Sequence, residues 1–257
     1  MRSTDDSKRR SDRDSVLAFL FAVVKFLARR IRRVCQPQQD FYKRAYSQEG
    51  EDLILQRIFH RRASGFYVDV GAHHPRRFSN THLFYELGWT GINIDALPGS
   101  MDAFRRERPR DFNVEVAIAN ASGEHRTLYI FDEPALNSLD EQLAHSREGG
   151  PDQRTLISQH DVLTSTLKDV LEAHLPTGEH IDFLSVDVEG LDLEVLQSNA
   201  WDLYRPTYVL AECYGIPWAR LGEEPVCRYL ESQGYELFAK TVNTVFFKDR
   251  SAPPVDP

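Results

Sequence analysis

The sequence has few cysteines and no long uninterrupted apolar run. Its 257 residues include three cysteines, Cys35, Cys213 and Cys227, and none of them stands in a CxxC pair. This spacing argues against a zinc site and a disulfide framework, and it fits a reducing compartment. A membrane-spanning helix needs about 20 apolar residues in succession. No such run occurs, so the sequence predicts no clear membrane span.

Basic residues are also in the minority. Lysine and arginine number 31 against 39 aspartates and glutamates, which gives a formal net charge of −8. Because nucleic-acid binders usually carry a basic excess, we expect no nucleic acid among the partners. The hydrophobic fraction of 41% is ordinary for a globular chain, and the length allows one sizeable domain with appendages.

The first 40 residues differ from the rest of the chain. Residues 1–14 are polar and are expected to be disordered. Residues 15–34 place apolar side chains such as Leu17 and Phe21 on one helical face and basic ones such as Arg29 on another. Such a helix can lie on an anionic membrane surface, pack against the domain, or act as a cleaved signal or short anchor. We expect a cytoplasmic protein, with peripheral contact at the inner face of the membrane as an open alternative.

From residue 41 onward, predicted strands and helices alternate. The expected strands are residues 66–70, 91–95, 113–119, 127–131, 181–186, 207–211, 235–241 and 244–248. The expected helices lie near residues 51–59, 81–87, 98–104, 164–174, 193–196 and 226–230. This alternation indicates an α/β domain over residues 41–250, with a mostly parallel seven-stranded sheet, helices on both faces and a C-terminal antiparallel hairpin. Residues 251–257 are expected to be a disordered tail.

The turn after the first strand contains only one glycine. A dinucleotide-binding turn has the pattern GxGxxG, which cradles a pyrophosphate. Here Gly71 is followed by His73, His74 and Pro75, so a cofactor without a pyrophosphate is favoured, and S-adenosylmethionine fits. Asp95 ends the next strand, where a carboxylate can accept both hydroxyls of a ribose. It is alternatively a helix cap near Pro98.

Three more acids follow the later strands. Asp187 and Glu189 come after the fourth strand of the βα series, and Glu212 follows the fifth. Because parallel strands end at one edge of the sheet, these acids are candidates for a catalytic base at a ligand site. Asp187 and Glu212 are also candidate ligands of Mg²⁺. His73 and His74 are rival bases. The competing interpretations are a helix cap for Glu189, a solvated loop acid for Glu212, and structural hydrogen bonding for the histidines.

Five motifs in order resemble the FkbM family of S-adenosylmethionine-dependent methyltransferases. They are SQEGED at residues 47–52, YVDVGAH at 67–73, SNT at 79–81, GWTGINID at 88–95 and FLSVDVEG at 183–190. The resemblance covers roughly residues 44–248. It implies a Rossmann-like class I methyltransferase fold and transfer of a methyl group, usually to an oxygen of a sugar or related natural product.

The resemblance also implies roles for single residues. It places Asp69, Gly71 and Ala72 beside the methionine part of the cofactor and Asp95 at the ribose. It places Ala117 and Ile118 beside the adenine. Glu51 either closes over the cofactor or caps its own helix.

The leading hypothesis is therefore an O-methyltransferase that acts on a hydroxyl of a sugar, glycolipid or related natural product. Its partner is a small-molecule or glycan acceptor, with walls expected from residues 132–153 and 213–221. The first alternative is a catalytically inactive membrane-peripheral protein of the same fold that binds cofactor or glycan. A nicotinamide-dependent oxidoreductase is the second, and the missing glycines argue against it.

Overall fold

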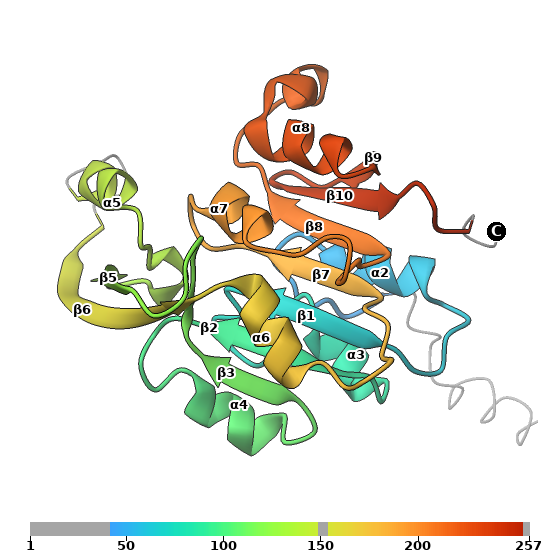
Figure 1. Ribbon diagram of the computed structural model, residues 1–257, viewed down its shortest axis with the longest axis horizontal. Helices are drawn as coiled ribbons and strands as arrows, with labels where there is room; N and C mark the ends of the chain where they lie inside the picture. Colours follow the sequence, from blue (N-terminus) through green and yellow to red (C-terminus); the bar gives the residue numbers. More distant parts are fainter. Residues whose placement is uncertain (1–41, 149–153, 254–257) are drawn as a thin grey trace, which may run out of the picture. The chain divides into compact units, whose positions relative to one another are not determined.

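The computed structural model in Figure 1 describes residues 42–148 and 154–253. The chain divides into two compact units, Met1–Arg44 and Ala45–Pro257. In the first unit, the described residues 42–44 form no helix or strand. The predicted N-terminal segment 1–40, with the amphipathic helix at 15–34, lies outside the described residues, as does most of the predicted tail 251–257. The second unit carries the sheet and its helices.

The second unit alternates strands and helices along the chain. Its strands are β1 (Phe66–Val70), β2 (Thr90–Asp95), β3 (Phe112–Glu115), β4 (Ala117–Ile118), β5 (His125–Phe131), β6 (Leu156–Ser165), β7 (Phe183–Val186), β8 (Tyr208–Glu212), β9 (Tyr235–Lys240) and β10 (Thr244–Asp249). Its α-helices are α2 (Glu51–Ile58), α3 (His82–Glu86), α4 (Met101–Glu107), α5 (Glu141–Arg147), α6 (Leu167–His174), α7 (Asp192–Gln197) and α8 (Pro225–Ser232). Two 3₁₀ helices, η1 (Pro134–Leu136) and η2 (Trp218–Glu223), complete the set.

Seven strands form one mostly parallel sheet, in the order β3-β2-β1-β7-β8-β10-β9. The pairs β2–β3, β1–β2, β1–β7 and β7–β8 are parallel, whereas β10 is antiparallel to both β8 and β9. Strand β10 lies between β8 and β9, so the C-terminal hairpin ends the sheet with β9 at its edge. The predicted fold class is confirmed. The reversal of strand order between β1 and β7 places a crevice at their carboxyl ends, where such sheets bind ligands.

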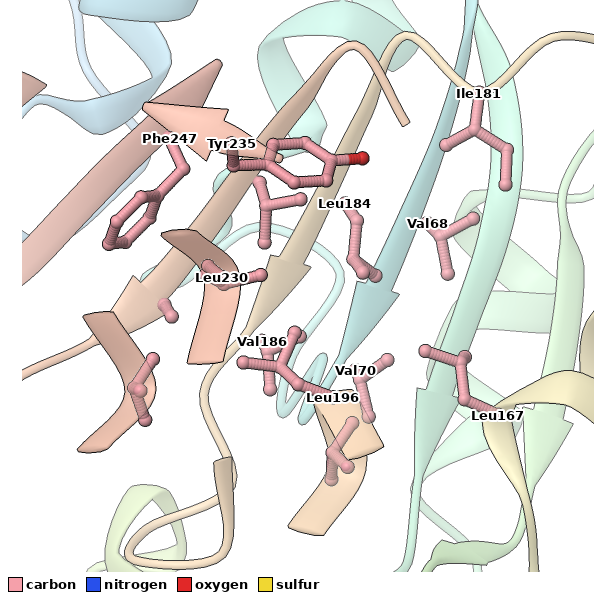
Figure 2. Close-up of a cluster of buried hydrophobic side chains, with 14 of the residues drawn as sticks. Val68, Val70, Leu167, Ile181, Leu184, Val186, Leu196, Leu230, Tyr235 and Phe247 are labelled. Carbon is pink, nitrogen blue, oxygen red and sulfur yellow. The ribbon is translucent and has the colours of Figure 1, made fainter. Parts of the chain in front are cut away.

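Helices cover both faces of this sheet, as predicted. On one face, Val68 and Leu184 pack in a cluster with Leu167 of α6, Leu196 of α7 and Leu230 of α8 (Figure 2). On the other face, Tyr67 and Phe183 pack against side chains of α2 and α3. Adjacent residues of β1 therefore point to opposite faces, and every residue of the strand is buried. This explains why the apolar residues of β1 follow one another without alternation, interrupted by Asp69.

A second, smaller sheet was not predicted. Its order is β4-β6-β5, with β4 parallel and β5 antiparallel to β6. The single strand predicted at 113–119 is divided, because residues 117–118 leave β3 and pair with β6. The helix predicted at 164–174 begins at Leu167, since the side chain of Thr166 accepts a hydrogen bond from the Asp169 amide at 3.0 Å. The polar segment from residue 132 contains η1 and α5, which form walls of the cavities described below.

A fully buried arginine ties the early elements together. Arg108, which follows α4, donates to the Tyr67 hydroxyl at 2.9 Å, to Thr81 Oγ1 at 3.0 Å and to Asp111 Oδ2 at 2.8 Å. Asp111 also accepts from the amide of Gly91 at 3.0 Å. Because a buried charge is tolerated only when it is paired and hydrogen-bonded, this network fixes β1, β2 and the start of α3 relative to one another.

Candidate active site

The glycine turn after β1 lies against the end of β7. Gly71 has a φ of +82°, and both its amide and that of Ala72 donate to the Ile94 carbonyl at 3.0 Å. A Cβ added to Gly71 would stand 1.7 Å from the carbonyl oxygen of Asp187. The sequence resemblance places Gly71 beside the cofactor. The structure adds a reason for a glycine at this position, which is the close contact between the two strand ends.

Asp95 is held by the loops on either side of it. Its Oδ2 accepts from the His73 amide and its Oδ1 from the Leu97 amide, each at 2.8 Å. Burial raises the pKa of this carboxyl, while the two amide hydrogen bonds oppose the rise. His73 reaches its position with a φ of 54°, unusual for a residue with a side chain. The carboxylate is thus oriented before any ligand arrives.

A first cavity opens beside this carboxylate at the carboxyl ends of β1, β2 and β7. Of the predicted site residues, those lining it are Gly71, His73, Asp95, Ile118, Asp187 and Glu189. Its apolar wall includes Leu97, Leu128 and Leu139, and its polar rim includes Asn137 and Ser138. No sequence motif marks any of these five residues, because Leu97 and Leu139 lie in loops, Leu128 is one of several apolar residues of β5, and the polar segment from residue 132 carries no motif.

Four residues predicted to bind cofactor are not among those that line the first cavity. Asp69 is buried and accepts from Thr81 Oγ1 at 2.9 Å, and burial raises its pKa to about 6. Ala72 packs in a cluster with Met101 and Phe104 of α4. Ala117 packs in a cluster with Leu128 and Val162. The buried Glu51 accepts from the Glu49 amide at 2.8 Å and from Thr241 Oγ1 at 3.0 Å.

The two histidines of the turn have different surroundings. The Nδ1 atom of His74 accepts from the amides of Arg76 and Arg77, each at 3.0 Å, so this ring caps its own loop. The ring of His73 lines the first cavity. Burial and the neighbouring Arg77 lower the pKa of His73, so its ring is neutral near pH 7 and can accept a proton.

Asp187, Glu189 and Glu212 form an acid cluster at the ends of β7 and β8. Each offers one carboxylate oxygen, and these three atoms lie within 4.8 Å of one another. Burial and the charge of Glu212 raise the pKa of Asp187 well above its ordinary range. Burial and the charge of Glu189 raise that of Glu212 to about 8. Arg147 of α5 pairs with Glu189, and Ser138 Oγ donates to the Glu189 carbonyl at 2.7 Å.

A fourth acid stands next to this cluster. Asp192 begins α7 and is 5% exposed, and its Oδ1 has no hydrogen-bond partner in the part of the chain that the structure describes. Burial and the charges of Asp187 and Glu189 raise its pKa well above the usual range. The sequence offered no signal for it, because an acid in the first turn of a helix is ordinary.

A second cavity of about 790 Å³ adjoins the first. Ala135 and Glu189 line both cavities. The acids Asp192, Glu212 and Glu224 contribute to the walls of the second, together with Arg77, Arg147 and Arg154. The segment predicted as a wall at 213–221 contributes Cys213, Tyr214 and Ile216. Arg220 of that segment instead pairs with Glu223 within η2.

Comparisons with known proteins complete the description. None of the curated proteins matches the chain. Among solved structures, an O-methyltransferase of Bacillus cereus in complex with SAH is 12% identical, with 88% of this chain and 89% of that chain covered and a TM-score of 0.39. A TehB-like SAM-dependent methyltransferase of Corynebacterium glutamicum is 10% identical, with 89% and 99% covered and a TM-score of 0.37.

These likenesses are too distant to bear on function, and the fold rests on the strand order given above. In the described residues, no helix combines the length and apolar character needed to cross a membrane. The family model described as the methyltransferase FkbM domain matches residues 69–237, a span that includes the glycine turn, Asp95 and the acid cluster. The chain therefore belongs to the FkbM family of methyltransferases.

Proposed function

We propose that the chain is an S-adenosylmethionine-dependent O-methyltransferase that acts on a hydroxyl of a sugar, glycolipid or related natural product. The observation that carries the proposal is the position of the acid cluster. Asp187 and Glu189 line the first cavity, while Glu189 and Glu212 line the second. A base for a hydroxyl acceptor has to reach the hydroxyl proton beside the line of methyl transfer, and carboxylates that line both cavities support that role.

The first cavity suits the methyl donor. Each Asp95 oxygen accepts one amide hydrogen bond and keeps a lone pair for a ribose hydroxyl. Leu97, Ile118 and Leu128 give an apolar wall for an adenine ring. The glycine turn lies beside the acid cluster, so a methionine part held there would present its sulfonium near Asp187.

Methyl transfer is then an in-line displacement. The acceptor oxygen bonds to the methyl carbon, the carbon–sulfur bond breaks, and its electron pair remains on sulfur as S-adenosylhomocysteine. The hydroxyl proton passes to a carboxylate of the acid cluster, for which we favour Asp187, because it lines the first cavity beside the glycine turn. His73, held neutral on the same cavity, is the second candidate. His74 is less suited because its Nδ1 is occupied by two backbone amides.

The acid cluster also fits a divalent cation such as Mg²⁺. Asp187, Glu189 and Glu212 present hard oxygen ligands close together, and the unpartnered Oδ1 of Asp192 lies among the charges of the same group. Within the described residues Arg147 is the arginine that pairs with this group, and a bound cation would offset the repulsion between carboxylates that raises the pKa of Asp187 and Glu212. Such a cation would lower the pKa of a bound hydroxyl. Asp187 and Glu212 would hold it, with Glu189 completing the set.

Transfer of label from S-adenosylmethionine tests the function. We expect wild-type protein to move a labelled methyl group into the glycan or glycolipid fraction of a cell extract, in an ether linkage stable to mild base. Asp187→Asn should lose at least about 100-fold in rate with the cofactor still bound. The exposed Asp102→Asn is the matched control. Label found only in protein or nucleic acid, or undiminished rate in Asp187→Asn, would refute the assignment.

We also keep peripheral membrane contact through residues 15–34 as a proposal, motivated by the apolar and basic faces of that segment. Cosedimentation with anionic liposomes tests it. The full chain should sediment with the vesicles, and a chain lacking residues 1–40 should not.

A further inference from the structure

Among the described residues, three arginines line the second cavity, and two of them bond to other groups of the protein. Arg77 makes two hydrogen bonds to the Glu133 carboxylate, at 2.8 and 2.9 Å. Arg147 pairs with Glu189 and donates its Nη1 to the Leu136 carbonyl at 2.6 Å. Each of these guanidinium groups therefore serves the protein's own structure.

Arg154 differs from the other two. Its Nε atom is buried and has no hydrogen-bond partner, and its guanidinium makes no ion pair with any residue in 42–148 or 154–253. A bridge between the backbones of Arg154 and Glu148 fixes the position from which the side chain starts. A buried donor without an acceptor is unfavourable, so a partner from outside the chain is expected.

The charges near Arg154 leave room for an anion. Arg147 pairs with Glu189, whereas Arg154 makes no ion pair with Asp187, Glu189 or Glu212. The acid cluster and Arg154 therefore occupy separate parts of the cavity wall. A cavity of about 790 Å³ can hold a sugar with a hydroxyl at one part of the wall and a charged substituent at another.

We propose that the methyl acceptor carries an oxyanion, a carboxylate or a phosphate, that binds to the free guanidinium of Arg154 in the second cavity. The Nε–H and one Nη–H of arginine form a fork that matches two oxygens of such a group. This contact orients the acceptor and leaves its hydroxyl at the acid cluster. The inference rests on the proposed function, because it names the class of acceptor for the same site.

Calorimetric titration of the full chain, saturated with S-adenosylhomocysteine, tests the proposal without turnover. The ligands are glucuronate, glucose 6-phosphate and neutral glucose. At least one of the two anionic sugars should bind about tenfold or more tightly than glucose. Arg154→Gln should reduce its affinity to that of glucose, and Arg154→Lys should restore part of the difference. Arg228→Gln on the exposed face of α8 removes the same charge elsewhere and should behave as wild type.

Two results would overturn the proposal. One is that neither anionic sugar binds wild-type protein more tightly than glucose does. The absence of a heat of binding for all three sugars counts as this result. The other is a gain that persists in Arg154→Gln with its melting curve intact. Failure of the proposed function would look different, because it would appear as absence of methyl transfer to any hydroxyl while this binding difference remained.

Discussion

A side-chain carbon on Gly71 would stand 1.7 Å from the carbonyl oxygen of Asp187, so the first turn of the sheet and the acid cluster meet at a single contact. Gly71→Ala should therefore force β1 and β7 apart. Gly123 is a matched control, because its φ of +80° is nearly the same and a Cβ there would meet nothing within 4 Å. We expect Gly71→Ala to lose about 2 kcal/mol or more of unfolding free energy beyond Gly123→Ala. Equal losses in denaturant unfolding would show that only the backbone conformation matters.

Cofactor affinity should depend on Asp95. Asp95→Ala removes the acceptor for the His73 and Leu97 amides as well as for the ribose. The dissociation constant for S-adenosylmethionine should rise about 10- to 100-fold by calorimetry, which corresponds to one or two hydrogen bonds to a charged group. Asp102→Ala, on the exposed side of α4, should leave it unchanged. An unchanged constant in Asp95→Ala would remove this residue from the cofactor site.

Binding of a divalent cation can be measured directly. Mn²⁺ added to the protein should lose free-ion signal in electron paramagnetic resonance, and Mg²⁺ should compete with it. Asp187→Asn and Glu212→Gln should each weaken binding about tenfold or more, since each removes a charged ligand. Glu236→Gln, an exposed acid of β9, is the control. If the Mn²⁺ signal is the same with all four proteins, the acid cluster holds protons and no cation.

Acid should weaken the pair between Arg77 and Glu133. The hydrogen bonds from Arg77 lower the pKa of Glu133 from 4.5 to about 2 in the folded protein. A lowered carboxyl pKa stabilises the fold above pH 4.5, and that stabilisation disappears as pH falls towards 2. At neutral pH the unfolding free energy of Glu133→Gln should thus be lower than that of wild type by at most about 1 kcal/mol, because the pair is partly exposed. Denaturant unfolding should show this difference in free energy shrinking towards pH 3. A difference that stays constant with pH would contradict the lowered pKa of Glu133.

Removal of the buried charge at Arg108 should be costly. Arg108→Gln removes one donor from the Asp111 carboxylate and the arginine donor from the Tyr67 hydroxyl. The expected loss is about 3–5 kcal/mol of unfolding free energy in urea. Arg110→Gln, two positions away and exposed, should cost less than about 1 kcal/mol. Comparable losses in the two variants would mean that the network contributes little.

Sequence patterns predicted the large sheet because its central strands are buried on both faces. Strands such as β1 and β7 are short, largely apolar runs that are followed by a glycine or an acid. The strand β6 was missed for the opposite reason. Among its ten residues only Val162 and Thr164 are buried, so its alternation between apolar and polar residues is too weak to distinguish it from a loop.

The candidate site was predicted where it is formed by strand ends and missed where it is formed by packing. Asp95 and the acid cluster follow directly from strand order. The positions of Asp192 and Arg154 in the site depend on how later segments of the chain return across the sheet. The spacing of neighbouring residues in the sequence does not show this path. Ala72 and Ala117 are adjacent to lining residues in sequence, yet Ala72 packs against α4 and Ala117 packs against Leu128 and Val162.

The buried guanidinium of Arg108 couples residues from several sequence motifs through shared hydrogen bonds. Tyr67, Thr81 and Asp111 share its hydrogen bonds, and Thr81 passes the contact on to Asp69. A substitution that removes a polar group at one of these positions leaves a donor or acceptor at another without its hydrogen-bond partner. We therefore expect them to change together in evolution, and a single exchange taken from a relative that lacks the arginine should be harmful in this background.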